Sequence, residues 1–378
     1  MEEYSMKVYS YFLDTIPGIG YGTVHKLITL YDNPRNVYFL SEYELSNLVE
    51  KKILTNRQKD SFVMHREQPL GKIYYNLTRE GIEIVSLWDY CYPEKLREIS
   101  VPPVNLYVKG QLPSCDKPAV GIVGARMCSD YGRYVARKYA EKIAEAGIEV
   151  ISGMAMGIDG IAQKAAISSG GKSYGILGCG VDRCYPESNR PLYDMLVING
   201  GVISEFPPGT EPRSGLFPLR NRIISALSDV LIVVEAREKS GTLITVDRAL
   251  EQGKEVYAVP GRITDSLSMG CNRLIEQGAE PAISPEKIID KVLSEHGCYK
   301  SSVQSESSPF ITAFPEGEDE QFVFSLLDDN GCEINEIYAK SAGKGRNFSV
   351  PDLYGVLMKL ELSGFVICDN GRYKYCRR

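Results

Sequence analysis

Short stretches that join glycine to arginine or hydroxyl side chains recur through the middle of the chain. The first is GIVGARMCS (121–129), which follows an apolar run and contains Gly124, Arg126 and Ser129. Glycine lets a backbone approach a ligand, an arginine fork matches a phosphate, and a serine can cap a helix or donate to a phosphate oxygen. The stretch predicts an anion site, with an ordinary strand–turn–helix corner and a surface arginine as the alternative. It lacks the GxGxxG spacing of dinucleotide sites.

A second stretch, SGMAMGIDG (152–160), follows the next apolar run. Its three glycines within eight residues predict a backbone nest for an anion. We expect Asp159 to cap the helix that follows rather than to act in catalysis.

A third stretch, GCGVDRCYP (178–186), follows the third apolar run. Gly180 and Arg183 suit a polyanion, and Tyr185 suits a stacked base. The alternative for Tyr185 is a turn residue that packs ahead of Pro186.

The stretch FPLRNRII (217–224) predicts a helix start, because proline is favoured in a first helical turn. Two arginines that stand two residues apart on a helix point to different faces. We expect one to bind a phosphate and the other to pair with an acid such as Glu205 or Asp229. The candidate ligand-binding residues of this stretch are Arg220 and Arg222.

The stretch EAREKSGTLIT (235–245) brings Ser240, Gly241 and Thr242 to the start of another helix, where hydroxyls and amides can bind a phosphate. Glu235 is the acid at this strand end that could serve as a base, but we expect it to be a buried partner of an arginine. The stretches PGR (260–262) and GCN (270–272) also predict loops at strand ends. Several anion-binding loops suit a chain of phosphates better than one small anion.

The elements that must position these loops alternate regularly. Apolar, β-rich runs at 119–123, 149–152, 174–177, 202–204, 230–234 and 255–259 are separated by amphipathic stretches at 131–146, 159–169, 188–199, 218–227, 242–252 and 285–295. This order predicts an α/β fold with a doubly wound, Rossmann-like, mostly parallel sheet. The loops then lie at the carboxyl edge of one sheet, where such folds bind ligands.

The chain is expected to contain further modules around this sheet. Residues 1–70 predict a small helical domain with a PGIG turn, and 71–297 predict the extended Rossmann-like domain, whose first part holds short strands. The Ser-rich and acidic segment 298–320 predicts a linker. Helices followed by a hairpin predict a winged-helix-like domain over 321–378.

The overall charge first argues against a nucleic-acid partner, because 43 basic and 49 acidic residues give a net charge of −6. Residues 117–225, however, hold 13 basic and 10 acidic residues, a net of +3, so the rest carries −6 − 3 = −9. Residues 316–336 hold eight acids and no base. We therefore expect a nucleic acid to bind one edge of the central domain and to avoid 316–336.

Metal, cofactor and membrane sites are not expected. The ten cysteines form no CxxC pair and there are three histidines, so a zinc site is improbable. No run of ~18 apolar residues predicts a membrane helix, and the acidic N-terminus does not predict a signal peptide. A cytoplasmic protein with reduced thiols is expected.

Together these motifs strongly resemble the DNA-processing protein A family (DprA, also called Smf). The resemblance rests on GIVGAR, SGMAMGID, GCGVDRCYP, ISEFPPG, FPLRNRII, VVEAREKSGTLIT, VYAVPGR and GCNRLIEQGA, densely over about 119–283. PGIG is similar to the hairpin of helix-hairpin-helix modules, and the first domain to SAM or helix-hairpin-helix folds. The sequence departs from the family pattern at GAR, where Ser often precedes Arg, and at GCN, where GTN or GSN is common.

The resemblance implies a non-catalytic protein that binds and protects single-stranded DNA and loads the RecA recombinase onto it in natural transformation or DNA processing. It also implies a homodimer. The family's DNA contacts carry over to Gly124, Arg126, Ser129, Ser152, Gly153, Met154, Ala155, Gly180, Arg183, Phe217, Arg220, Asn221, Arg222, Ser240, Gly241 and Thr242.

Two other functions are weighed against this one. A nucleoside-monophosphate phosphoribohydrolase-like enzyme would share a Gly-Thr loop and a nearby glutamate. Here Lys239 precedes the SGT sequence in place of Pro-Gly, and Glu235 lies upstream, which weakens the enzyme hypothesis. An adaptor that binds only proteins is the third possibility.

Overall fold

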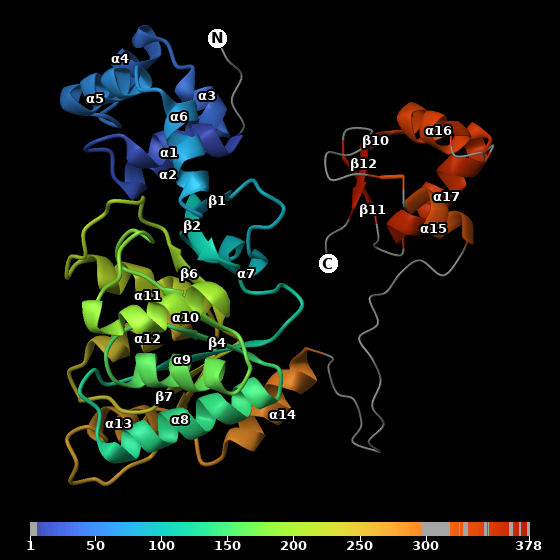
Figure 1. Ribbon diagram of the computed structural model, residues 1–378. Coiled ribbons are helices and arrows are strands. Elements are labelled where there is room, and N and C mark those ends of the chain that lie inside the picture. The colour runs from blue at the N-terminus through green and yellow to red at the C-terminus, as the bar shows by residue number, and fades with distance from the viewer. Residues whose placement is uncertain are drawn as a thin grey trace. The chain divides into compact units, whose positions relative to one another are not determined.

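The computed structural model describes residues 6–296, 318–324, 326–327, 332–343, 346, 348–362, 366–369 and 372–375. The chain divides between Lys300 and Ser301 into two compact units. We describe each unit by itself (Figure 1). No helix of the described residues is long and apolar enough to cross a membrane.

The first unit begins with short helices, as the sequence predicts. They are α1 (Met6–Thr15), α2 (Tyr21–Tyr31), α3 (Pro34–Tyr38), α4 (Glu42–Glu50), α5 (Asn56–Arg66) and α6 (Leu70–Arg79). Ser41 and Thr55 start α4 and α5 with complete capping boxes. The helices pack around Phe12, Leu27 and Phe62. The expected boundary after residue 70 falls inside α6. The SAM or helix-hairpin-helix character of these helices stays a prediction.

A nine-stranded sheet forms the rest of this unit, in the order β1-β2-β6-β5-β4-β3-β7-β8-β9. Its strands are β1 (Glu83–Ser86), β2 (Asn105–Gly110), β3 (Ala119–Val123), β4 (Glu149–Ser152), β5 (Ser173–Ile176), β6 (Gly200–Ser204), β7 (Val230–Val233), β8 (Glu255–Ala258) and β9 (Glu280–Pro281). β1 pairs with β2 and β2 pairs with β6 in antiparallel fashion, and the remaining pairs are parallel. The expected mostly parallel, doubly wound sheet is confirmed.

Helices cover both faces of the sheet (Figure 1). They are α7 (Glu94–Arg97), α8 (Asp130–Glu145), α9 (Ile158–Ser168), α10 (Arg190–Ile198, after the 3-10 turn Glu187–Asn189), α11 (Leu216–Leu227), α12 (Gly241–Glu251), α13 (Met269–Glu276) and α14 (Pro285–Glu295). Alternation along β3 sends Val120 and Ile122 toward α8 and α9, and Ala119 and Val123 toward α11 and α12. The prediction of a loop at 270–272 is wrong, because these residues lie in α13.

The order of the strands creates a switch point beside β3. The chain runs from β3 through β4 and β5 to β6, then returns to the other side of β3 and continues through β7 and β8. Helices that follow β3 and β7 therefore leave toward opposite faces. A crevice opens between the carboxyl ends of two such strands, and this is where doubly wound folds bind ligands.

Within its described residues, the second unit holds three helices and a small sheet. Its elements are α15 (Glu318–Phe324), β10 (Cys332–Glu333), α16 (Ile334–Gly343), α17 (Val350–Leu362), β11 (Val366–Asp369) and β12 (Arg372–Tyr375), with strand order β10-β12-β11. Residues 318–320, expected in the linker, belong to α15. The rest of the expected linker and the tip of the hairpin lie outside the described residues. The winged-helix character of this unit stays a prediction.

Candidate functional site

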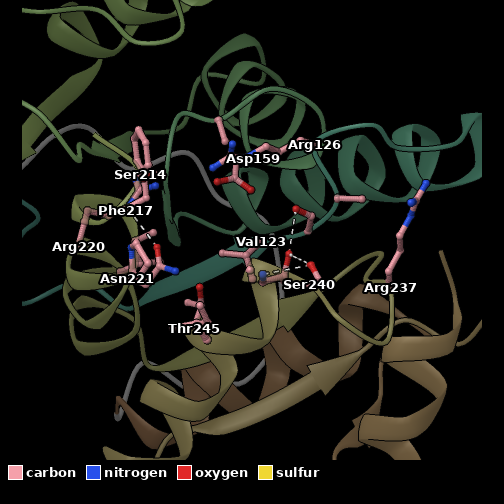
Figure 2. Close-up of a pocket in the computed structure, with 18 of the residues that line it drawn as sticks. Val123, Arg126, Asp159, Ser214, Phe217, Arg220, Asn221, Arg237, Ser240 and Thr245 are labelled. Carbon is pink, nitrogen blue, oxygen red and sulfur yellow. Dashed lines mark hydrogen bonds between the residues drawn. The ribbon is translucent and has the colours of Figure 1, made fainter. Parts of the chain in front are cut away.

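A cleft of about 590 Å³ opens at the carboxyl ends of β3 and β7. Its walls come from the loops after these two strands and from the first turns of α11 and α12 (Figure 2). The structure thus brings together many of the residues that the sequence singled out. Those that line the cleft are Gly124, Arg126, Ala155, Phe217, Arg220, Asn221, Ser240, Gly241 and Thr242.

The cleft is strongly cationic. Arg126, Arg237 and Lys239 line it with exposed side chains, and no carboxylate of the described residues forms an ion pair with any of them. Arg126 and Arg237 reach it from separate loops (Figure 2). Arg220 adds a fourth cation, and Asp159 is the acid among the lining residues. Such a surface favours a ligand with several negative charges.

Arg220 forms the floor of the cleft and is 5 % exposed. Its guanidinium donates to the carbonyl oxygen of Gly153 at 2.7 Å and to that of Ile176. Burial lowers the pKa of Arg220 to about 10, so the side chain is still a cation at neutral pH. The structure therefore holds a fixed positive charge beneath the ligand space.

Asp159 lies beside Arg220 and does not cap a helix. α9 begins at Ile158 with Gly157 at its cap, so Asp159 falls within the first turn. Its carboxylate accepts a hydrogen bond from the amide of Gly153 at 3.1 Å. Burial raises the pKa of Asp159, while the Arg220 cation and the Gly153 amide oppose that rise. The predicted capping role is wrong, and the carboxylate instead lies within electrostatic reach of the Arg220 cation.

Aromatic rings form one wall of the cleft. The rings of Tyr185 and Phe217 stack with centroids 5.4 Å apart and planes 26° apart. The Arg126 guanidinium lies 5.6 Å from the Phe217 centroid on this wall. Gly178 makes room for the Phe217 ring, since a Cβ at residue 178 would lie 2.6 Å from that ring. Tyr185 is 43 % exposed, so a base can stack on this wall while cations bind its phosphates.

The start of α12 offers backbone amides to the cleft. Ser240 caps the helix by accepting from the Thr242 amide at 3.2 Å. The Thr242 hydroxyl donates to the Gly124 carbonyl oxygen at 3.2 Å, which ties the loop after β3 to α12. A helix start with exposed amides and hydroxyls favours an anion.

The start of α8, by contrast, already holds an internal anion. Glu235 is 1 % exposed and accepts from the Ser129 amide at 2.9 Å and from the Ser129 hydroxyl. Ser129 also accepts from the Gly132 amide at 3.1 Å. The expectation that Glu235 pairs with an arginine is wrong, since its partner is Ser129. Neither residue lines the cleft, so the candidate base of the enzyme hypothesis is not among the groups that face a ligand there.

The loop after β4 supports the cleft from below. Ala155 lines the cleft, whereas Ser152, Gly153 and Met154 are buried beneath it. Ser152 donates to the Ile122 carbonyl oxygen at 2.6 Å, and the Met154 amide donates to Gln163 at 3.0 Å. Met154 has φ of 51°, a strained conformation that this packing holds in place.

Three other predicted residues lie away from the cleft. Gly180 is buried, and the Arg183 guanidinium lies 3.0 Å from Glu211. Arg222 forms a two-pronged ion pair with Glu205, at 2.6 Å for the shorter contact. The structure does not place these three residues against the same ligand space. Their DNA-binding roles stay predictions.

The Arg222 pair belongs to a region that we call the helix–sheet junction. In it the Arg222 guanidinium lies 5.4 Å from the centre of the Tyr21 ring on α2. Asp14 of α1 accepts from Asn105 at 3.2 Å and from the Tyr107 hydroxyl at 2.9 Å. The junction thus consists of Asp14, Tyr21, Asn105, Tyr107, Glu205 and Arg222, and it joins the N-terminal helices to the sheet.

Arg237 and Lys239 are cleft residues that the sequence reasoning assigned no role. Both stand in EAREKSGTLIT, directly before the serine that caps α12. Two cations before a hydroxyl-rich helix start are the sequence signal that could have assigned them to the anion site. Among the described residues no group of three or more His, Cys, Asp or Glu side chains is placed to hold a metal ion.

Comparison with known proteins matches the chain to a family of DNA-processing proteins. The family model described as DNA recombination-mediator protein A matches residues 83–293. The DNA processing protein DprA of Streptococcus pneumoniae is 42% identical over 204 residues, which are 54% of this chain and 72% of that protein.

Solved structures agree with this match. The X-ray structure of DprA from Streptococcus pneumoniae has a TM-score of 0.64 at 33% identity, over 77% of this chain and 99% of that one. A DprA structure from Helicobacter pylori, described as showing a unique single-stranded DNA binding mode, has a TM-score of 0.52 at 30% identity. It covers 56% of this chain and 97% of its own.

Proposed function

Because this chain belongs to the DNA recombination-mediator protein A family, we propose that it binds single-stranded DNA in the cleft at the carboxyl ends of β3 and β7. The observation that carries the proposal is the cationic cleft with a stacked aromatic wall. Arg126, Arg237 and Lys239 would pair with phosphates, and Tyr185 and Phe217 would stack with bases. The single-stranded DNA binding described for the Helicobacter pylori relative supports the same ligand.

The contacts explain why the binding should not depend on base sequence. Arginine forks and helix-start amides recognise phosphates, which every nucleotide carries. Every base also has a face that can stack on an aromatic ring, at about 1–3 kcal/mol per base. Arg220 below the cleft contributes a charge that does not have to move when the ligand binds.

Fluorescence anisotropy with a labelled oligothymidine tests the proposal. The wild-type protein should bind with an affinity that falls as salt rises, because each phosphate contact releases counterions. Arg126→Ala should weaken binding by about 10-fold or more and reduce the salt slope by about 0.7. Arg273→Ala is the matched control, since Arg273 is exposed but already lies 2.9 Å from Glu238, outside the cleft lining. Salt-independent binding, or an Arg126→Ala variant that binds like wild type, overturns the proposal.

We further propose that the bound strand is protected and passed to the RecA recombinase, that the protein acts in the cytoplasm as a homodimer, and that it catalyses no covalent step. The open carboxyl edge of the sheet supports this proposal, since a strand held there through phosphates keeps some of its bases accessible. A RecA ATPase assay on DNA coated with single-strand-binding protein should show faster activation with the wild-type chain than with Arg126→Ala. Equal rates would contradict the loading role, and sedimentation velocity would test the dimer.

A further inference from the structure

The outer face of α8 carries cations and an aromatic ring that the fold does not use. Val135, Ala136, Tyr139, Ala140 and Ile143 face the sheet and are buried. On the opposite face, the exposed Lys142 and Glu145 pair with each other near the end of the helix. The exposed residues before them include Arg133, Tyr134, Arg137 and Lys138. Positions three and four apart are neighbours on a helix surface, so these four side chains form one patch, which we call the α8 patch.

The charges of the α8 patch are available to a ligand. Arg137 and Lys138 make no ion pair or hydrogen bond with any residue in the described part of the chain. Arg133 lies 3.8 Å from Asp130, whose side chain is fully exposed. An exposed pair of this kind contributes little energy and is easily replaced. Tyr134 is 64 % exposed, so its ring can accept a stacked group.

The α8 patch continues from the cleft. Arg126 and Met127 line the cleft, Ser129 caps α8, and the patch begins in the first turns of that helix. At 1.5 Å per residue, Lys138 lies about 14 Å along the helix axis from Ser129. α8 forms part of the outer layer on its face of the sheet, next to α9 and α14 (Figure 1). Along the chain, Met127 of the cleft lining and Arg133, the first residue of the patch, are six residues apart, with the exposed Asp130 between them.

We propose that single-stranded DNA leaving the cleft follows the exposed face of α8. Arg133, Arg137 and Lys138 pair with its phosphates, and Tyr134 stacks with a base. The combination of cations with an exposed aromatic ring suits a single strand, which presents both phosphates and unpaired bases. This inference rests on the proposed function, since the strand must first occupy the cleft.

The test compares two oligothymidines, of about 4 and about 16 nucleotides, the range that single-strand sites span. The wild-type protein should bind the longer one more tightly. The double substitution Arg137→Ala with Lys138→Ala should weaken binding of the longer strand by about 10-fold and reduce its salt slope by about 1.4, with the shorter strand unaffected. Tyr134→Ala should weaken the longer strand by about 5-fold or more, with an unchanged salt slope. Alanine favours helices, so these variants should fold.

The matched control is Lys117→Ala with Lys172→Ala, which removes the same charge from exposed residues at the opposite edge of the sheet, before β3 and β5. It should leave both affinities unchanged. If the wild-type protein binds neither oligothymidine, the proposed function itself is refuted. If the wild-type protein binds normally and the α8 variants still prefer the longer strand as strongly as the wild type does, only the α8 path is overturned. The same holds for a change in oligomeric state on sedimentation without a change in DNA binding, which would assign the patch to a second copy of the chain.

Discussion

α11 supplies two arginines, two residues apart, to two regions of opposite character. Arg220 lies under the cleft, where neighbouring cations lack carboxylate partners and stay exposed. Arg222 lies in the helix–sheet junction, where Glu205 takes both of its terminal nitrogens. The residue type is the same, so the surroundings decide the role. Arg220, held by backbone carbonyl oxygens, places its charge under a cationic cleft, whereas the ion pair of Arg222 with Glu205 joins two parts of the fold.

The largest effect is expected from a substitution that breaks the helix–sheet junction. Arg222→Ala leaves the buried Glu205 carboxylate without its partner, which should lower the free energy of unfolding by about 3–5 kcal/mol. Burial already raises the pKa of Glu205 against the pull of Arg222, so loss of Arg222 should raise that pKa further. Urea denaturation measures the loss. DNA affinity of the folded fraction should not change.

A double variant separates the contribution of the ion pair from that of the volume its side chains fill. Arg222→Met with Glu205→Leu replaces both charges by apolar groups and should recover most of the stability. If Arg222→Ala instead keeps full stability and loses DNA affinity, the assignment of Arg222 to the junction is wrong. The sequence-based expectation of a DNA contact at Arg222 would then hold.

The second prediction disturbs the cleft from beneath. A Cβ at Gly153 would lie 2.6 and 2.7 Å from the terminal nitrogens of Arg220 and 2.7 Å from an Asp159 oxygen. Gly153→Ala should therefore displace the Arg220 charge, lower oligothymidine affinity by about 10-fold and lower stability by about 1–3 kcal/mol. Gly215→Ala is the control, because a Cβ there meets nothing within 4 Å. Equal DNA affinity in the two variants would show that the position of Arg220 does not matter.

Much of the fold followed from the sequence because its signals are local. The continuous apolar run at 119–123 is β3, and the amphipathic stretch at 131–146 is α8. α13 was missed because Gly270 and Asn272 are typical of a turn. Gly270 is needed instead for packing, since a Cβ there would lie 2.6 Å from the Ala236 carbonyl oxygen.

The site was less predictable, because its partners are distant in sequence. Helix periodicity was enough to separate Arg220 from Arg222, and that separation is confirmed. The partner of Glu235 is Ser129, 106 residues away, which no local pattern indicates. Asp159 is a typical capping residue, but Gly157, with φ of 77°, occupies the cap and leaves the carboxylate to turn toward Arg220.

The smallest expected effect returns to the junction and concerns pH. Burial raises the pKa of Asp14 to about 7, although Asn105 and Tyr107 donate hydrogen bonds that favour its charged form. The folded state therefore binds this proton more tightly than the unfolded state, whose carboxyl has a pKa of about 4. The stability from Asp14 is complete below about pH 4 and is lost as pH rises toward 7.

Asp14→Asn should remove this dependence, because the amide oxygen can still accept both hydrogen bonds and carries no charge. Between pH 5 and 8, assay pH values chosen to bracket the raised pKa, wild-type stability should fall by on the order of 1 kcal/mol more than that of the variant. Chemical denaturation across this range measures the difference. Asp14 does not line the cleft, so DNA affinity per folded molecule should show no step that Asp14→Asn removes. A step in affinity near pH 7 that Asp14→Asn abolishes would mean that the two regions are coupled.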